Sequence, residues 1–446
     1  MSRRPPRAKA PPRAKAPRGV RELTPTFKRK PKLDSRAKPL HARPATHDAK
    51  AARVIAPHGA PSITLPPTLG EKLSQGHPWV YRDHVPPGFA AADGSFVFVR
   101  AGSFSGFALW DNSSPIALRL FSRIAAPDAA FVRERVRAAL SLRQQLRERD
   151  TTAFRLLYGE GDGLPGVTVD VYDRYAVIVT YANALERIVP WVVDALRAEL
   201  PLDGILQRRR TREEEERISV LSGHEPNGSV LVREYGVRFR ADLRAGQKTG
   251  LFLDHRENRA YVREHSAGKR VLNLFSYTGG FSVCAALGGA MHVTSVDIAP
   301  QAIAAAAENF AENQLPAAMH EGVARDVFEY LEDAQQKGRE FDLIVCDPPS
   351  FAASRDKQYA ALRAYTRLNA LGLSRVRRGG LYAAASCTAQ VSPEAFRATL
   401  AQAAERARVR FQIIHDVGQP VDHPVFAGHP EGRYLKFVVG RVLAVV

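Results

Sequence analysis

The pattern of apolar and polar positions changes twice along the chain. From residue 62 to 126, short apolar runs with the length and composition of β-strands alternate with turn signals. From 128 the apolar positions take helical spacing up to 149, and two strand-like runs, a helix near 185–200 and strands near 230–240 follow. This pattern predicts a small β-rich module over 62–126 and an α+β module over 128–243, which the strands near 230–240 would close.

From residue 245 onward, strands and helices alternate. The expected strands are 271–275, 293–298, 341–346 and 381–385. Helices are expected to begin after the first strand at Gly279-Gly280, after the second at Pro300, and near residue 358. Such alternation is typical of a mainly parallel, doubly wound sheet with helices on both faces. The sequence therefore predicts a Rossmann-like α/β domain over 245–446.

The positive charge is concentrated at the N-terminus. The chain has 446 residues and a formal charge of +18, and residues 1–60 hold 17 Lys and Arg against three acids, so this segment carries 17 − 3 = +14. Its Pro-rich, like-charged composition predicts a disordered tail. It could attract RNA phosphates or act only as a solubilising tail. The proline density disfavours a mitochondrial transit peptide, which would need an amphipathic helix.

The three cysteines lie in the C-terminal half and match no zinc-binding spacing, so no metal site is predicted. Three cysteines cannot all pair, and this fits a reducing, cytoplasmic compartment. No run of about 18 uncharged apolar residues is present, so no membrane association is expected.

A cofactor site is expected after the first strand of the α/β domain. Glycines in the turn 275–281 would let a ligand approach the backbone. Neither a Gly-x-Gly-x-x-Gly motif nor a P-loop is present, which disfavours a dinucleotide or a nucleotide triphosphate. Asp297, after the second strand, could bind ribose hydroxyls, and Asp326 could bind an adenine amino group. This order fits S-adenosylmethionine (SAM). Taken singly, Gly279 could serve only packing, Asp297 a helix cap, and Asp326 an ordinary loop.

Two reactive groups end neighbouring strand-like runs. Asp347 opens Asp-Pro-Pro after the strand 341–346, and Cys387 follows 381–385. Because ligands gather at the carboxyl ends of strands in such sheets, a carboxylate and a thiol there form a candidate site for covalent chemistry. The alternative for Cys387 is a structural thiol, as is expected for Cys346 and Cys284.

Several long runs resemble bacterial large-subunit ribosomal RNA methyltransferases, specifically the cytosine-C5 branch with an N-terminal PUA domain. The runs are GEK at 70–72, HPWV at 77–80, GEGDGLPG at 159–166, QKTGLFLDHR at 247–256, LFSYTGGF at 274–281, DHP at 422–424 and PEG at 430–432. The resemblance covers about residues 62–446. It implies a PUA-like domain that docks RNA, a class I methyltransferase domain and a homodimer.

The resemblance also implies a cofactor pocket. Its SAM-binding residues would be Asn273, Phe275, Tyr277, Gly279, Asp297, Asp326 and Asp347, with Lys248 beside them. Cys387 would then attack C6 of cytosine and activate C5, while Asp347 would bind the N3–N4 edge of the base. The base would have to be unstacked or flipped out to reach this site.

Alternatives remain for the reaction. Ser350 follows Asp-Pro-Pro where cytosine-C5 relatives often have lysine, and a sister branch that methylates guanine N7 also shows serine or threonine there. Cys387 favours the cytosine reading, because N7 has its own lone pair and needs no cysteine. A third reading is a non-catalytic RNA-binding assembly factor that retains SAM. In the PUA-like part, Trp79, Tyr81 and Arg82 could contact nucleotides, although a core position is favoured for Trp79.

Overall fold

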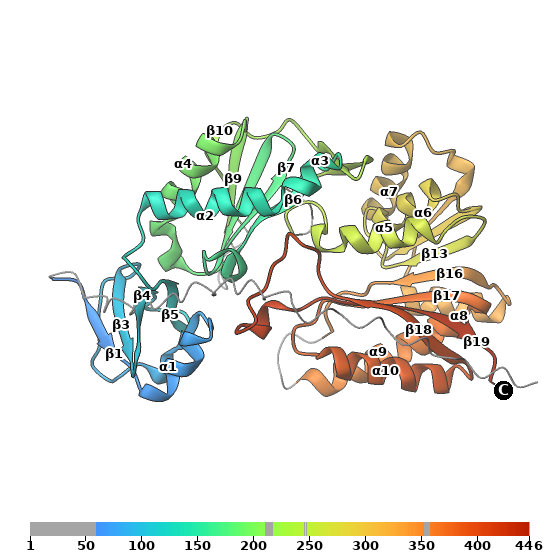
Figure 1. Ribbon diagram of the computed structural model, residues 1–446. Helices are drawn as coiled ribbons and strands as arrows, with labels where there is room; N and C mark the ends of the chain where they lie inside the picture. Colours follow the sequence, from blue (N-terminus) through green and yellow to red (C-terminus); the bar gives the residue numbers. More distant parts are fainter. Residues whose placement is uncertain (1–58, 210–216, 245, 247, 352–356, 446) are drawn as a thin grey trace, which may run out of the picture. The chain divides into compact units, whose positions relative to one another are not determined.

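The computed structural model describes residues 59–209, 217–244, 246, 248–351 and 357–445 (Figure 1). Nearly all of the predicted basic tail, most of the charged run 208–216, and Gln247 lie outside the described residues. Within the described part, no helix is long and apolar enough to cross a membrane.

The first module is a five-stranded sheet with one helix. Its elements are β1 (Ser62–Thr64), α1 (Pro67–Ser74), β2 (Trp79–Tyr81), β3 (Phe96–Ala101), β4 (Phe104–Trp110) and β5 (Ile116–Ser122). The strand order is β1-β3-β4-β5-β2, in which β1 and β3 pair in parallel and the other neighbours antiparallel. The strands predicted from the apolar runs are present.

The second module places two helices on a five-stranded sheet (Figure 1). Its elements are α2 (Ala129–Leu142), α3 (Gln144–Glu148), β6 (Ala153–Tyr158), β7 (Val167–Tyr172), β8 (Tyr175–Thr180), α4 (Val189–Glu199), β9 (Gly204–Arg209) and β10 (Arg217–Gly223). The strand order is β10-β9-β8-β7-β6. Val132 and Val136 of α2 share a buried cluster with Leu196 of α4 and with the inner face of the sheet, so this part is the α+β module that the pattern predicts.

Two expectations for this region differ from the structure. The helix expected over 128–149 is interrupted at Arg143, because the buried guanidinium of Arg143 turns inward to bond Asp162 and the backbone oxygen of Asp422. The strands near 230–240, β11 (Val230–Glu234) and β12 (Val237–Ala241), form a separate two-stranded ribbon instead of closing the middle sheet. The ribbon packs on a helix of the C-terminal module, whose Asn309 accepts a hydrogen bond from the backbone N–H of Arg240.

The C-terminal module is a seven-stranded sheet between helices. After α5 (Arg256–Glu264) come β13 (Arg270–Leu274), α6 (Gly280–Leu287), β14 (His292–Asp297), α7 (Pro300–Glu312), β15 (His320–Ala324), α8 (Val327–Gln336), β16 (Phe341–Cys346), α9 (Gln358–Leu373), β17 (Val376–Ser386), α10 (Pro393–Arg406), β18 (Arg410–Val417) and β19 (Lys436–Leu443). The strand order is β15-β14-β13-β16-β17-β19-β18. The first five strands pair in parallel, while β19 pairs antiparallel with both β17 and β18.

Successive residues of the central strands feed two different cores. In β13, Val271 packs in one cluster with α5, α6 and α7, and Leu272 packs in another with α8, α9 and α10. Side chains alternate between faces along a strand, so a strand covered on both sides is apolar throughout. The predicted mainly parallel, doubly wound sheet is confirmed.

Candidate active site

The carboxyl ends of the parallel strands bring the predicted site residues to one edge of the sheet. Leu274 of β13 is level with Cys346 of β16, and Cys346 is level with Ala384 of β17. Asp347 therefore follows one strand and Cys387 follows its immediate neighbour. Asp297 ends β14 on the other side of β13, and Asp326 follows β15.

The turn between β13 and α6 has an unusual backbone. Phe275 and Tyr277 have φ angles of 56° and 47°, and Gly279 has 77°. For residues with a side chain this region is disfavoured, and such strain is concentrated at functional sites. A Cβ on Gly279 would lie 2.7 Å from the Cβ of Ala306 in α7, so this glycine also serves close helix packing. The positive φ angles of Phe275 and Tyr277 are therefore maintained by contacts with the rest of the fold and not by the intrinsic preference of these residues.

Asp297 holds that turn and is not the cap of α7. Its Oδ2 accepts the backbone N–H of Tyr277 at 2.9 Å, and its Oδ1 accepts that of Ala299 at 3.0 Å. The N-cap position of α7 belongs to Ala299. A carboxylate has about four acceptor sites, so Asp297 retains capacity for ligand hydroxyls.

Asp326 is the N-cap of α8, a role that the sequence reading did not assign. Both of its cap hydrogen bonds, from the backbone of Phe328 and Glu329, end on Oδ1 at 2.8 and 3.1 Å. Its second oxygen makes no hydrogen bond to the described residues. Asn273 is buried in β13 and donates to Ser282 Oγ, and its Oδ1 likewise has no partner in the described part of the chain. Asp326 Oδ2 and Asn273 Oδ1 are thus two acceptors without a partner among the described residues.

Lys248 belongs to a charged cluster that the sequence reading missed. Its Nζ lies 2.7 Å from Oδ2 of the buried Asp254 and 4.3 Å from the centre of the Phe252 ring. Burial alone would raise the pKa of Asp254, but the charges of Lys248 and nearby imidazoles outweigh it, and the pKa lies well below the usual range. Tyr434 donates to the same oxygen. The signal was present, since Asp254 lies inside the recognised run 247–256.

Asp347 is oriented by a buried histidine that the sequence reading also missed. The Nε2 of His255 lies 3.2 Å from Oδ2 of Asp347, and its Nδ1 is 2.9 Å from the amide nitrogen of Asn258. In the tautomer with hydrogen on Nε2, the ring accepts from Asn258 and donates to Asp347. The contact fixes one carboxylate oxygen and leaves the partly exposed remainder of the group accessible.

Cys387 differs from the other two cysteines in exposure and surroundings. Cys284 and Cys346 are buried, which raises the pKa of each thiol to about 12. Cys387 is half-buried, and burial together with the nearby Asp347 carboxylate raises its pKa to about 11. Lys248 and Lys436 act in the opposite direction. The thiol is therefore protonated at neutral pH, although the two nearby lysines favour the thiolate.

Lys436 is a second group without a sequence signal. Only 3 % of it is exposed, and its Nζ donates to the backbone oxygens of Thr388 and Tyr434 at 2.6 and 2.8 Å. Burial lowers the pKa of Lys436 to about 8, and the neighbouring Cys387 partly opposes this. It lies on β19, which returns antiparallel beside β17 and so reaches the cysteine turn.

Hydroxyl groups fix the turn that carries Cys387. The Oγ1 of Thr388 lies 3.0 Å from Ser350 Oγ and 2.7 Å from the hydroxyl of Tyr365, to which Ser386 Oγ also donates. Ser350 thereby connects the Asp347 loop to the Cys387 turn. Ser350, which in the sequence favoured guanine N7 over cytosine C5 as the methyl acceptor, thus has a structural role.

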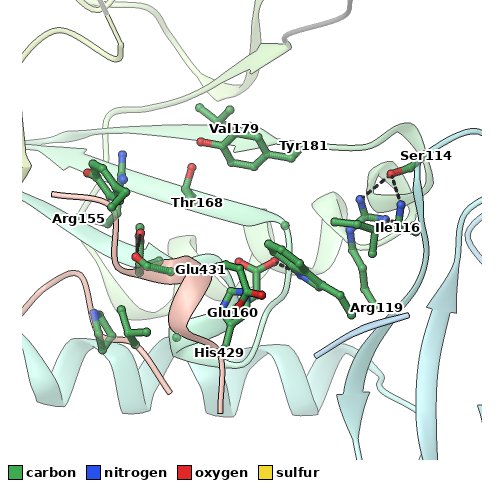
Figure 2. Close-up of a pocket in the computed structure, with 18 of the residues that line it drawn as sticks. Ser114, Ile116, Arg119, Arg155, Glu160, Thr168, Val179, Tyr181, His429 and Glu431 are labelled. Carbon is green, nitrogen blue, oxygen red and sulfur yellow. Dashed lines mark hydrogen bonds and ion pairs between the residues drawn. The ribbon is translucent and has the colours of Figure 1, made fainter. Parts of the chain in front are cut away.

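Cys387 and Lys248 are among the residues that line a cavity of about 660 Å³. Figure 2 shows other lining residues of this cavity, among them Arg155, Thr168 and Tyr181. Its other walls come from the first and second modules and from the segment 424–434. Trp79 lines this cavity and donates its indole N–H to Glu160, so the core position favoured for it from sequence is wrong. Among the described residues, no group of three or more His, Cys, Asp or Glu is arranged to hold a metal ion.

Comparison with known proteins identifies the family. A family model described as S-adenosylmethionine-dependent methyltransferase matches residues 185–424, and a PUA-like domain model matches 63–123. A ribosomal RNA large subunit methyltransferase of Deinococcus radiodurans is 38% identical over 82% of this chain and 93% of its own. Ribosomal RNA large subunit methyltransferase I of Aeromonas salmonicida is 34% identical over 83% and 96%. The chain belongs to this methyltransferase family.

Two solved methyltransferase structures are similar in fold to this methyltransferase. The methyltransferase SMU.776, whose crystal structure is a complex with SAH, has a TM-score of 0.76 and 28% identity over 86% of this chain and all of its own. A SAM-dependent methyltransferase from Streptococcus mutans has a TM-score of 0.75 and 26% identity over the same shares. The cofactor is therefore SAM, and the domain order is PUA-like, α+β, then class I methyltransferase.

The edge residues fit that cofactor. Asp297 and the second oxygen of Asp326 offer acceptors to hydroxyl and amino groups. The unpartnered Oδ1 of Asn273 is a further acceptor. An acceptor-rich site of this kind suits a ligand that carries ribose hydroxyls, amino groups and a positively charged sulfonium.

Proposed function

We propose that this methyltransferase modifies carbon 5 of a cytosine in large-subunit ribosomal RNA through a transient bond between Cys387 and C6 of the base. The observation that carries the proposal is the half-buried Cys387, which follows β17 next to the strand that Asp347 follows and which lines a cavity. The names of the relatives support the RNA class. SAM supplies the methyl group from its sulfonium.

The cysteine is what a carbon acceptor needs. Carbon 5 of cytosine is a weak nucleophile, and addition of a thiolate to C6 moves electron density onto it. The S–C6 bond forms as the C5–C6 double bond opens toward the methyl donor. After methylation, C5 carries both its hydrogen and the methyl group. A base, either water or a nearby side chain, takes that proton; the C–H electrons restore the double bond and the thiolate leaves C6. The products are the methylated base, SAH and the free cysteine.

Asp347 is proposed to bind the N3–N4 edge of the base. A carboxylate there accepts from the exocyclic amino group, and in its protonated form it donates to N3 and so favours the addition. His255 holds one carboxylate oxygen, and the two prolines that follow stiffen the turn. Lys436 is proposed to favour the thiolate of Cys387 as the proton leaves the sulfur. The SAM-binding roles of Asn273, Phe275, Tyr277, Gly279, Asp297, Asp326 and Lys248 belong to the same proposal.

A second candidate function is methylation of guanine N7. Ser350, in place of the lysine expected after Asp-Pro-Pro, is the observation that favours it. The hydrogen bond between the hydroxyls of Ser350 and Thr388 weakens this argument, because a serine that holds the Cys387 turn needs no connection with a purine. A non-catalytic assembly factor is the third reading, and it predicts no methyl incorporation into any RNA.

Nucleoside mass spectrometry of ribosomal RNA separates these readings. In a strain that lacks this protein, we expect loss of 5-methylcytidine at one large-subunit position, restored by the wild-type gene. The Cys387→Ala variant should not restore it, while its affinity for SAM should be unchanged. Loss of 7-methylguanosine instead would replace the proposal with the second reading.

A matched control separates the thiol chemistry from folding. Cys284→Ala removes a buried thiol in α6 and should restore the modification as the wild type does. Restoration by Cys387→Ala to near-normal levels would exclude the covalent mechanism even if the product is 5-methylcytidine.

A further inference from the structure

The cavity that contains Cys387 is larger than one target base requires. Its volume of about 660 Å³ lies within the range of pockets that enclose whole drug-sized ligands. The turn at 275–281, Asp297 and Asp326 are not among its lining residues. Most of the cavity wall is provided by residues outside the C-terminal module.

One wall is a face of the middle sheet. Thr168 of β7 is directly opposite Val179 of β8, so their side chains share a face, and Tyr181 follows two residues later (Figure 2). Arg155 of the neighbouring strand β6 lies on the same face. Its guanidinium forms two hydrogen bonds with the Asp170 carboxylate, both at 2.8 Å. The wall combines an aromatic ring, an aliphatic side chain, a hydroxyl and a fixed cation.

Thr168 and Tyr181 carry the argument for a ligand. Only 6 % of Thr168 is exposed, and its Oγ1 makes no hydrogen bond to the described residues although it lines the cavity. A buried hydroxyl without a partner costs free energy unless a ligand completes it. Tyr181 is 57 % exposed, so its ring is available for stacking in the cavity. Among the described residues, no side chain makes a hydrogen bond to the Thr168 hydroxyl, and the Tyr181 ring stays largely exposed.

We propose that this cavity binds an unpaired nucleotide next to the target base, whose ring stacks on Tyr181 and whose edge hydrogen-bonds Thr168. This inference rests on the proposed RNA substrate. Proteins that recognise single-stranded RNA stack unpaired bases on aromatic rings and read their edges by hydrogen bonds. The hydroxyl both donates and accepts, so it suits a base edge.

The test uses full-length protein and an unmodified in vitro transcript of large-subunit ribosomal RNA. Affinity is measured with excess transfer RNA as competitor, and methyl incorporation is measured as kcat and KM. Tyr181→Ala should weaken binding and raise KM for the RNA by roughly 5- to 100-fold, the loss of one base–aromatic stack, with KM for SAM unchanged. Tyr181→Phe should behave like the wild type. Tyr359→Ala removes a more exposed tyrosine from α9 and serves as the matched control.

The variant Thr168→Val distinguishes a role of the hydroxyl in RNA binding from a role in the stability of the fold. Because the hydroxyl has no partner within the described part of the chain, the valine variant should keep or raise the melting temperature, while kcat/KM for the RNA falls about tenfold through loss of one hydrogen bond. Thr168→Ser should keep the activity. Methyl incorporation is counted for all products, so the test is valid whether the product is 5-methylcytidine or 7-methylguanosine. The measurement of RNA affinity is informative even if the protein transfers no methyl group. Wild-type affinity and KM in both Tyr181→Ala and Thr168→Val would overturn the proposal and leave a protein segment as the occupant.

Discussion

Cys387 and Lys436 form an electrostatic pair that neither residue's own sequence context reveals. The thiol has a pKa of about 11 because burial and Asp347 oppose its ionisation, and Lys436 opposes them from the neighbouring strand. At neutral pH a thiol of this pKa is ionised in only about one molecule in 10⁴. Each nearby cation therefore changes directly the fraction of reactive thiolate.

Lys436→Met should raise the pKa of Cys387 by removal of this cation. The acid limb of the kcat/KM profile would move to higher pH, and activity at neutral pH would fall about tenfold if the pKa changes by one unit. Lys436→Arg keeps the charge and should retain most of the activity. The pH profile is the measurement. An unshifted profile for Lys436→Met would show that the lysine only braces the turn through its two carbonyl contacts.

At the same scale, the sequence located some site residues and not others. Asp347 and Cys387 follow apolar runs, and the carboxyl end of a parallel strand is where ligand chemistry is expected. His255 and Lys436 reach the site from a helix start and an antiparallel strand. Periodicity does not tell which distant elements pack beside a strand end, so Lys436 could not be predicted. His255 lies inside the recognised run 247–256, but the run alone does not show that it contacts Asp347.

At the scale of elements, the segment between β18 and β19 joins modules through one carboxylate. Asp422 accepts two hydrogen bonds from Arg256, at 2.8 and 2.9 Å, and one from the backbone N–H of Arg155, while its backbone oxygen accepts from Arg143. All these groups but Arg155 are fully buried. The broken helix at Arg143 is explained by the same cluster, which lies 279 residues away in sequence and leaves no local signal.

Asp422→Asn should lower the free energy of unfolding by about 3–5 kcal/mol, because Arg256 would remain buried with an uncompensated charge. Asp416→Asn breaks an exposed pair with Arg397 and should cost less than about 1 kcal/mol. Urea unfolding at pH 7 measures both. Equal stabilities of the two variants would contradict this account of the segment.

The same carboxylate sets a direction for acid sensitivity. Burial alone would raise the pKa of Asp422, but Arg256 and His423 outweigh it, and its pKa in the folded protein lies well below the usual range. The folded-state pKa is depressed, so the stabilisation is fully present above the unfolded value of about 3.9 and is lost as the pH falls below it. Wild-type stability should therefore decrease more steeply than that of Asp422→Asn under acid conditions.

At the scale of the whole molecule, the positive charge is concentrated at one end of the sequence. Residues 1–60 carry +14 of the total +18, so the remainder carries +4. The order of the modules and the doubly wound sheet were predictable, because strand and helix periodicities persist over many residues. The separate β11–β12 ribbon was not, since an apolar alternation does not specify which sheet or helix it will cover.

Deletion of residues 1–58 should weaken RNA binding and flatten its dependence on salt, because fewer cations would displace counterions from the phosphates. A Gly/Ser-rich segment of equal length is the control for bulk. Binding is measured over a series of salt concentrations. The same slope for the deleted and the full-length protein would leave the tail without a role in RNA attraction.

The covalent bond to Cys387 is the central claim, and RNA that contains 5-fluorocytidine tests it most directly. After methylation, C5 of that base carries fluorine and no hydrogen, so the last proton cannot be removed and the adduct persists. The tryptic peptide 379–397 contains Cys387 as its only cysteine. We predict that mass spectrometry will find this peptide carrying methylated 5-fluorocytidine when SAM is present. Methylation of ordinary RNA without any such adduct would contradict the mechanism.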